Sequence, residues 1–222
     1  MYGFKLYGYW RSSASYRVRI ALNLKGLSYE QISVDLLAGE QNPSEQNLGA
    51  LDALNPQHMV PVLMHGERVM RQSLAIIEWL EEHFEGRGHT LISATDARER
   101  IRVRSIAQLI ACDIAPVNVL RVLAYLEKEA GFDMPKKLAW MQHWMLEGFT
   151  PLERLLDSAS TGAFCEGDAP TLADCCLIPQ VYNAKRWQLD MTEFPIIERI
   201  YQHAMQMQEF IDAAPENQPD AD

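Results

Sequence analysis

The first third of the chain alternates short apolar runs with one helical stretch. Phe4–Trp10 is a compact apolar and aromatic run that predicts a buried strand, and Tyr29–Val34 alternates as a second strand. Between them, Ser15–Lys25 has helical periodicity, hydroxyl residues precede it, and Gly26 follows as a stop signal. The pattern therefore predicts a strand, a tight turn, a helix and a second strand.

The next segment predicts a loop, a hairpin and another helix. Asp35–Asn55 is polar and contains Gly and Pro, so we expect a loop with at most one short helix. Val60–His65 and Glu67–Met70 predict a hairpin. Ser73–Phe84 carries apolar residues at helical spacing, and Ser73 stands where a helix cap belongs.

Nearly everything after Ser93 predicts helix, which suggests a boundary near Gly86–Ala94. The fold class is therefore α/β followed by all-α, with one domain over residues 1–86 and an all-helical domain over residues 93–222. Helices are expected over Thr95–Glu129 with a break at Pro116, over Pro135–Ser158, over Thr171–Lys185 behind a capping box at Thr171–Asp174, and over Phe194–Ala213, while the tail Pro215–Asp222 is expected to hang free.

Composition narrows the class of function. The formal net charge of −10 disfavours nucleic acid or an anionic membrane as the main partner, because phosphate surfaces attract clustered Lys and Arg. No apolar run approaches the roughly 20 residues of a spanning helix, and Met1–Trp10 is too short and too polar for a secretory signal, so we expect a cytoplasmic protein. With no CxxC pair and no zinc-ligand cluster, the cysteines are expected to be buried apolar thiols: Cys112, Cys165, Cys175 and Cys176.

Three short segments of the α/β part carry candidate chemistry. Ser12 and Ser13 lie where a strand passes into a helix N-terminus, a place that favours anions, although both serines can also serve only as caps. Val60-Pro61 opens a strand with extended backbone that can pair with a peptide, and Gln72-Ser73 opens a second helix suited to a carboxylate. Together these features can hold a short peptide along its length.

Five segments, RSSASYRVRIALNLKG, ALNPQHMVPVL, RQSLAIIEWLEEHF, GDAPTLADCCLIPQV and the tail QPD, resemble zeta-class glutathione transferases, a family that includes maleylacetoacetate and maleylpyruvate isomerases. The likeness runs over almost the whole chain and keeps the order of the motifs. It implies a thioredoxin-like N-terminal domain, an all-helical C-terminal domain and glutathione bound between them, usually in a homodimer.

The resemblance also implies site residues. Ser12 and Ser13 match the serines at the glutathione sulfur, Val60 before a cis Pro61 matches the backbone that pairs with the cysteinyl part, Gln72 and Ser73 match the pair at the γ-glutamyl group, and Gln41 is a further contact. Two positions depart from the family. Ala14 replaces the usual Cys, so no cysteine can act there, and Ala115 stands where relatives often carry Gln or His.

This likeness implies a glutathione-dependent isomerase that acts on a small maleyl diketo acid in aromatic amino-acid (tyrosine and phenylalanine) or other aromatic catabolism. A thiolate stabilised by Ser12 would add to the cis double bond, permit its rotation and then leave, which yields the trans (fumaryl) isomer. Arg11, Arg121 and Arg186 are the candidates for holding substrate carboxylates and developing negative charge, whereas Arg17 and Arg19 are expected to serve structure.

Three alternatives remain at this stage. The same thiolate would also serve a transferase that conjugates or dehalogenates small α-halo acids, with consumption of glutathione. A non-catalytic binding protein can keep the fold without the activity. A thiol–disulfide oxidoreductase is disfavoured because the turn Ser12-Ser13-Ala14 has no cysteine.

Overall fold

A computed structural model describes residues 3–34, 36 and 45–221 of the chain. It divides into two compact units, Met1–Leu91 with Gln206–Asp222, and Ile92–Met205. The passage between them falls inside Gly86–Ala94, where the sequence pattern changes. At the other end the structure differs from the sequence-based boundaries, since Gln206–Asp222 clusters with the first unit instead of the helical one.

The first unit is built on a four-stranded sheet with the order β2-β1-β3-β4. Its strands are β1 (Phe4–Gly8), β2 (Tyr29–Ser33), β3 (Val62–His65) and β4 (Arg68–Arg71). β1 pairs parallel with β2, whereas the β1–β3 and β3–β4 pairs are antiparallel. This arrangement confirms the thioredoxin-like βαβ and ββα pattern.

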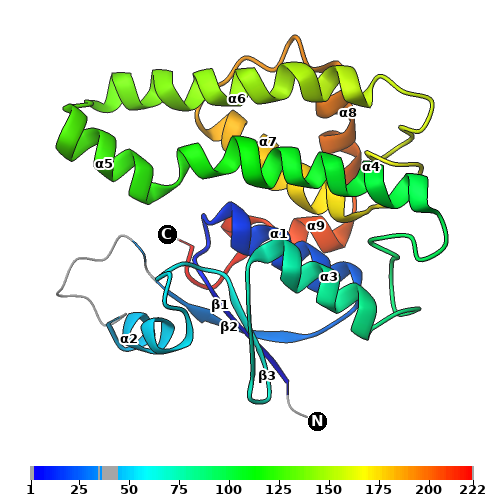
Figure 1. Cartoon of the computed structure of the whole chain (residues 1–222), viewed down its shortest axis with the longest axis horizontal. Coiled ribbons are helices and arrows are strands. Elements are labelled where there is room, and N and C mark those ends of the chain that lie inside the picture. Colours follow the sequence, from blue (N-terminus) through cyan, green and yellow to red (C-terminus); the bar gives the residue numbers. More distant parts are fainter. Residues whose placement is uncertain (1–2, 35, 37–44, 222) are drawn as a thin grey trace. The chain divides into compact units, whose positions relative to one another are not determined.

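Helices lie on both faces of this sheet (Figure 1). α1 (Ser13–Leu24) and α3 (Ser73–His83) pack against each other on one face, and α2 (Glu45–Leu54) lies on the other. α1 ends before Gly26, whose φ of 62° is a left-handed conformation that glycine adopts at little cost. α9 (Gln208–Ala213) packs on α1 and leads into the short 3-10 helix η3 (Pro215–Asn217).

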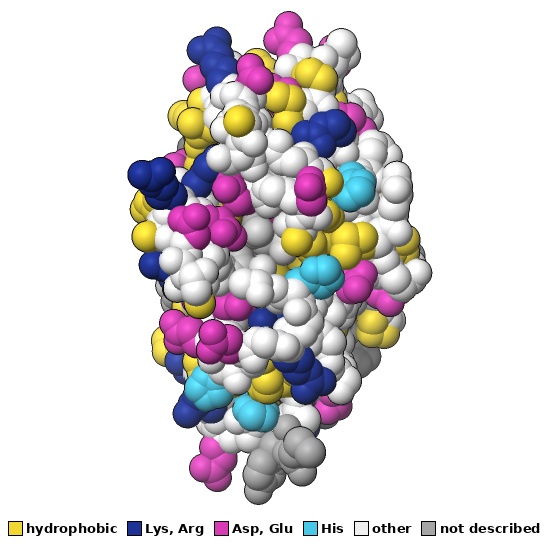
Figure 2. Space-filling model, turned by 90° about the vertical axis from the view of Figure 1, so that its right-hand side faces the viewer, with side chains coloured by type: hydrophobic (Ala, Val, Ile, Leu, Met, Phe, Trp, Pro, Cys, Tyr) yellow, Lys and Arg dark blue, Asp and Glu magenta, His cyan; other side chains and the backbone are white. Residues whose placement is uncertain are grey.

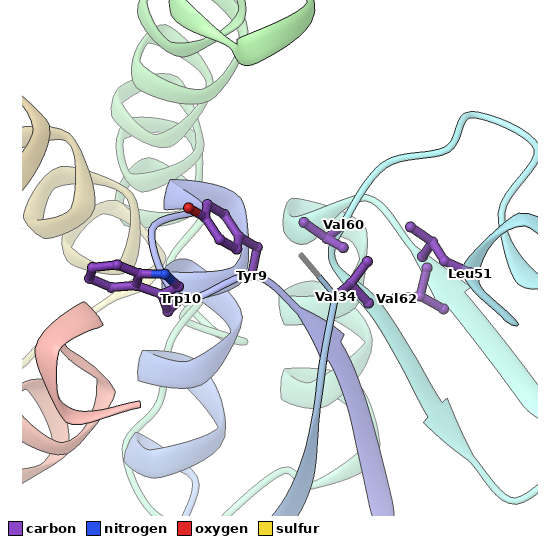
Figure 3. Packing of buried hydrophobic residues seen from close by; sticks show 6 residues of the cluster. All are labelled: Tyr9, Trp10, Val34, Leu51, Val60 and Val62. Carbon is purple, nitrogen blue, oxygen red and sulfur yellow. The ribbon is translucent and has the colours of Figure 1, made fainter. Parts of the chain in front are cut away.

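A hydrophobic cluster lies between the turn that follows β1 and the turn that precedes β3. It contains Tyr9, Trp10, Val34, Leu51, Val60 and Val62. Figure 3 shows the valines and Leu51 gathered side by side, with Tyr9 and Trp10 extending from the end of β1. The cluster therefore packs the turn after β1 and the turn before β3 into one core.

The second unit is helical. Its elements are α4 (Ala97–Gln108), the π-helix η1 (Leu109–Ile114), the 3-10 helix η2 (Ala115–Asn118), α5 (Leu120–Ala130), α6 (Met134–Leu156), α7 (Leu172–Arg186) and α8 (Pro195–Ala204). The break expected at Pro116 is confirmed, because the α-helix gives way to π and then 3-10 geometry there. The capping box of Thr171 and Asp174 is also confirmed.

One sequence-based expectation about membranes needs correction. The run Ala97–Ala130 spans 34 residues and contains an 18-residue window with a mean hydropathy of 1.7, of which 11% is buried. By length and composition this run is apolar enough to cross a membrane, contrary to the expectation that no run is. Length and composition alone say little, however, because core helices of soluble proteins pass the same test and Pro116 interrupts this helix.

Three further expectations were wrong in part. The tail does not hang free, because η3 and the residues up to Ala221 are held by hydrogen bonds and packing in the first unit. Cys112 is exposed, whereas the other three cysteines are buried as expected. Ser73 is the first residue of α3, and the cap position belongs to Gln72.

Candidate active site

Ser12 caps α1 at the end of a tight turn. Its main-chain N–H donates to the carbonyl of Tyr9 at 2.9 Å, and its hydroxyl oxygen accepts from the N–H of Ser15 at 3.2 Å. The Ser12 hydroxyl thus accepts a hydrogen bond from the helix, and its own O–H can still donate to a ligand. Ser13 follows as the first residue of α1 and is half-buried. This turn offers a hydroxyl donor together with the partial positive charge of a helix start.

The Val60-Pro61 turn is the second element of the site. The peptide bond between the two residues is cis, as the resemblance implied. Val60 precedes β3, lies outside the strand register, and no main-chain hydrogen bond joins it to another described residue. Its N–H and C=O are therefore suited to pairing with the main chain of a peptide ligand.

The third element is the N-terminus of α3. Gln72 has a φ of 67°, a left-handed conformation that is costly for a residue with a side chain and is concentrated at functional positions. No side chain caps this helix, and its first turn contains no acidic residue. α1, α4, α6 and α7 each receive a side-chain cap, whereas α5, α8 and α9 lack one as α3 does. The open N–H groups beside the buried Ser73 are suited to a carboxylate.

Contacts within the first unit bring these three elements together. The guanidinium of Arg17, on α1, donates to the Ser73 hydroxyl at 3.3 Å and so ties the first turn to the start of α3. Trp10 and Val60 belong to the same hydrophobic cluster, which ties the first turn to the cis proline turn. The Gln72 amide donates to the side-chain oxygen of Gln57 at 2.8 Å.

The candidate arginines fall in different units. Arg11 lies in the first turn, and its guanidinium stacks on the Trp10 indole with 3.8 Å between the guanidinium carbon and the ring centroid. Arg121 is an exposed residue of α5, and Arg186 ends α7 with its guanidinium 4.5 Å from the Trp187 ring centroid. Both belong to the second unit. Gln41 lies outside the described residues.

Sequence reasoning missed one contact to the first turn. The carboxylate of Asp220 accepts a hydrogen bond from the main-chain N–H of Trp10 at 3.1 Å. The sequence did contain a signal, because the tail QPD was part of the family likeness, but the contact spans 210 positions and no periodicity points to it.

Two of the buried cysteines are poorly suited to act as nucleophiles. Burial raises the pKa of Cys165 and of Cys175 well above the ordinary thiol value, so both remain protonated near neutral pH. Position 14, in the first turn, is an alanine. Among the described residues, no group of three or more His, Cys, Asp or Glu side chains is placed to hold a metal ion. The first unit contains no cysteine, so a thiol acting at Ser12 within this unit would have to come from a bound molecule.

Glutathione fits the residues that are present. It is a γ-glutamyl tripeptide with a thiol, a main chain and carboxylates, and these groups match the Ser12 hydroxyl, the Val60 main chain and the uncapped start of α3 in kind. Each chemical group of glutathione thus has a suitable hydrogen-bond donor or acceptor at one of three turns in the first unit.

Comparison with known proteins agrees with this chemistry. Residues 6–88 match the family described as Glutathione S-transferase, N-terminal domain. A probable maleylacetoacetate isomerase of Vibrio cholerae is 46% identical over 97% of this chain and 97% of its own length. The solved structure of a maleylpyruvate isomerase, a bacterial zeta-class glutathione transferase, has 45% identity and a TM-score of 0.91, covering 98% of this chain and 100% of that one. Another solved structure, a maleylacetoacetate isomerase of Methylobacterium extorquens AM1 with bound malonate and glutathione, has 40% identity and a TM-score of 0.88 over 98% and 99%.

The fold and the three turns define a glutathione transferase architecture, with a thioredoxin-like unit and a helical unit. Within that class the similarity extends along both units at 40% identity or more. The chain belongs to the zeta-class glutathione transferase family, the family of the maleylacetoacetate and maleylpyruvate isomerases.

Proposed function

We propose that this protein is a glutathione-dependent cis–trans isomerase that converts a maleyl diketo acid, maleylacetoacetate or maleylpyruvate, into its fumaryl isomer. The observation that carries the proposal is the geometry of Ser12, whose hydroxyl is oriented by α1 and keeps a proton to donate. The relatives named as isomerases over nearly the full chain support the same substrate class.

Bound glutathione would supply a thiolate able to add reversibly to the activated double bond of the substrate. Ser12 stabilises that thiolate by donating a hydrogen bond, with the start of α1 adding partial positive charge, and Ser13 assists from the first helical position. Val60 holds the peptide backbone, and Gln72 and Ser73 hold the γ-glutamyl end at the uncapped start of α3. Gln41 is proposed as a further contact.

Substrate binding is assigned to arginines. Arg11 stands next to Ser12 and is kept in place by stacking on Trp10, so it is placed to hold a carboxylate or to stabilise negative charge that develops during the reaction. Arg121 and Arg186 are proposed to hold substrate carboxylates from the helical part. In this proposal residues 1–86 form the glutathione-binding domain, and residues 93–222 form the substrate-binding domain apart from the tail, which packs with the first unit.

The proposal extends to assembly and location. A homodimer is supported by large apolar side chains of the second unit that are at least 41% exposed, namely Ile101, Leu120, Tyr125, Met134, Leu146 and Leu155. Light scattering coupled to gel filtration tests this, and a monomeric mass would reject it. Acidic and basic side chains are interspersed on the face shown in Figure 2, which together with the net charge of −10 suits a cytoplasmic enzyme of aromatic catabolism.

The Ser12→Ala variant tests the proposal. Following the absorbance of each maleyl compound with and without glutathione, we expect wild-type turnover to require glutathione and Ser12→Ala to lower turnover by about 100-fold, with a modest loss of glutathione affinity, because one preorganised donor is removed. Ser28→Ala, an exposed serine of the same unit, is the control and should leave turnover unchanged. Full activity in Ser12→Ala would show that Ser12 is not the activator.

The alternatives give different outcomes in the same assay. Isomerisation regenerates glutathione, whereas conjugation or dehalogenation of α-halo acids consumes it, so a thiol titration during turnover separates the two. A chain that fails to bind immobilised glutathione would instead be a non-catalytic relative.

A further inference from the structure

The C-terminal tail is fastened to the first unit by side-chain and main-chain hydrogen bonds. Gln218 is buried, and its amide donates to the carbonyls of Asp212 and Ala214 at 2.9 and 2.8 Å. Asn217 donates to the carbonyl of Ile211 at 2.7 Å. These bonds fold the chain back on the end of α9 and fix where the last residues lie.

Asp220 is the residue of this tail that reaches the first turn. One of its carboxylate oxygens accepts from the main-chain N–H of Trp10 at 3.1 Å, and the other accepts from the amide of Gln31 on β2 at 2.7 Å. The next residue, Ala221, packs against the hydrophobic cluster that contains Trp10 and Val60. The carboxylate is therefore held from two sides while it bonds the turn.

The turn needs such an acceptor. Tyr9 and Ser12 close a four-residue turn through the bond from the Ser12 N–H to the Tyr9 carbonyl, with Trp10 and Arg11 at its corners. The N–H of the first corner residue has no acceptor within a turn of this kind, and Trp10 is only 4% exposed. Without Asp220 this N–H would be a buried donor with no partner.

The carbonyl group of Trp10 is also linked to the C-terminal segment, through the side chain of Arg19. The Trp10 carbonyl accepts from the guanidinium of Arg19 at 3.0 Å, and Arg19 also donates to the carbonyl of Ala213 at 2.9 Å. The Trp10 indole in turn carries the Arg11 guanidinium at 3.8 Å. The position of Trp10 thus sets the position of Arg11 and the direction of Ser12.

We propose that Asp220 is a positioning residue for the reaction, acting through the Trp10 N–H to hold Arg11 and Ser12 in their working geometry. The inference rests on the proposed function, since it assigns Asp220 to the same sulfur-activating turn. What the turn requires from Asp220 is an acceptor and not a charge, because a negative charge near the turn opposes formation of a thiolate there.

Asparagine and alanine at position 220 separate these requirements. Asp220→Asn keeps an oxygen for the Trp10 N–H, and the Gln31 amide can rotate so that its oxygen accepts from the new side chain. Asp220→Ala removes the acceptor. Asp212→Ala is the matched control, because it removes a carboxylate from the same C-terminal segment that accepts from the Gln208 amide at 2.6 Å and not from Trp10.

Three measurements form the test. Hydrogen exchange of the peptide that contains Trp10, in protein without glutathione, reports on the hydrogen bond from the Trp10 N–H to Asp220. Thiolate absorbance of bound glutathione against pH gives the pKa of the bound thiol, and steady-state kinetics separate kcat from the KM for glutathione. We expect Asp220→Ala to speed exchange at Trp10, to raise the pKa of the bound thiol and to lower kcat about tenfold, with less than about a threefold change in KM. Asp212→Ala should stay near wild type in all three. Asp220→Asn should keep wild-type exchange and kcat, with a bound-thiol pKa equal to or below that of wild type, because it keeps the acceptor and removes the negative charge.

The outcomes distinguish failure of the positioning role of Asp220 from failure of the proposed function. Unchanged exchange at Trp10 in Asp220→Ala would show that Asp220 does not hold the turn. Faster exchange with a wild-type thiol pKa and kcat would reduce Asp220 to a purely structural residue. A wild-type protein that binds no glutathione would refute the proposed function, and the catalytic half of this inference with it. If Asp220→Ala does not fold, Gln31→Leu takes its place, because it removes the donor that orients Asp220 and should give the same changes in smaller degree; wild-type values in that variant would also overturn the inference.

Discussion

Replacement of Asp174 by alanine should remove a large share of the stability of the helical unit. This side chain is fully buried, and its oxygens accept from the Cys165 N–H at 2.9 Å, the Thr171 N–H at 2.8 Å and the Thr171 hydroxyl at 3.0 Å. The variant leaves two buried main-chain donors without an acceptor, each worth about 1–3 kcal/mol. Relief of the buried charge offsets part of this loss, so we expect a net loss of about 3 kcal/mol, against the roughly 5–15 kcal/mol that stabilises a typical protein.

Urea denaturation followed by circular dichroism at pH 7 measures the change. Asp190→Ala is the control, since Asp190 is an exposed carboxylate in the same unit that accepts from the Thr192 N–H at 2.9 Å. We expect the control to lose less than about 1 kcal/mol, as exposed polar substitutions usually do. If Asp174→Ala also stays within about 1 kcal/mol of wild type, the assignment of the capping box as a determinant of stability is wrong.

Asp174 also predicts a dependence on pH. Burial raises the pKa of this carboxyl above its ordinary value, despite the hydrogen bonds from Cys165 and Thr171 that lower it. Between the ordinary and the raised pKa the folded protein binds more protons than the unfolded chain, so the contribution of Asp174 to stability is full at the acid end and is lost as the pH rises. Asp174→Asn lacks this titration, and the stability of wild type relative to that variant should decrease as the pH rises through the window. A difference that is constant or grows with pH would contradict this sign.

Two further predictions follow from packing. Gly148→Ala should lower the free energy of unfolding by about 1–3 kcal/mol in a thermal or urea titration, because an added Cβ would lie 2.2 Å from Cγ1 of Ile114. Gly49→Ala, on an open helix surface, is the control and should be neutral or stabilising in the same titration. Equal effects of the two substitutions would show that the contact is easily relieved. Ellman's reagent should react rapidly with one thiol per native chain, because Cys112 is exposed and the other three cysteines are buried. Cys112→Ser should abolish this rapid reaction, and two or more rapidly reacting thiols would contradict the burial.

Local rules account for much of what the sequence predicted correctly. The end of α1 before Gly26, the interruption at Pro116 and the cap at Thr171 each depend on one or two residues whose conformational preferences act within a turn. Ser12 was predicted at the start of α1 for the same reason, and it caps that helix. The roles of these residues toward glutathione came from family likeness and stay a proposal.

Long-range packing explains what the sequence did not predict. α9 has an ordinary helical pattern, which does not reveal whether it packs with the helical unit or on α1, and it does the latter. Side chains of α1 hold it there, because the fully buried Arg19 donates to the carbonyl of Ala213 and Asn23 donates to the carbonyl of Glu209. A tail of polar residues and prolines likewise gives no periodic signal, although Gln218 and Asp220 both find partners in the first unit.

The burial of two arginines on α1 follows from what the proposed site has to do. Arg17 and Arg19 are 4% and 0% exposed, and burial of a charged group is costly unless hydrogen bonds compensate. Arg17 meets Ser73 at the start of α3, while Arg19 meets the Trp10 carbonyl in the turn before α1. One helix thus holds both the turn assigned to the sulfur and the turn assigned to the carboxylate, and two buried side chains of the first unit fix their spacing. Two enclosed positive charges also favour anions within this unit, which is the electrostatic condition that a thiolate and a carboxylate share.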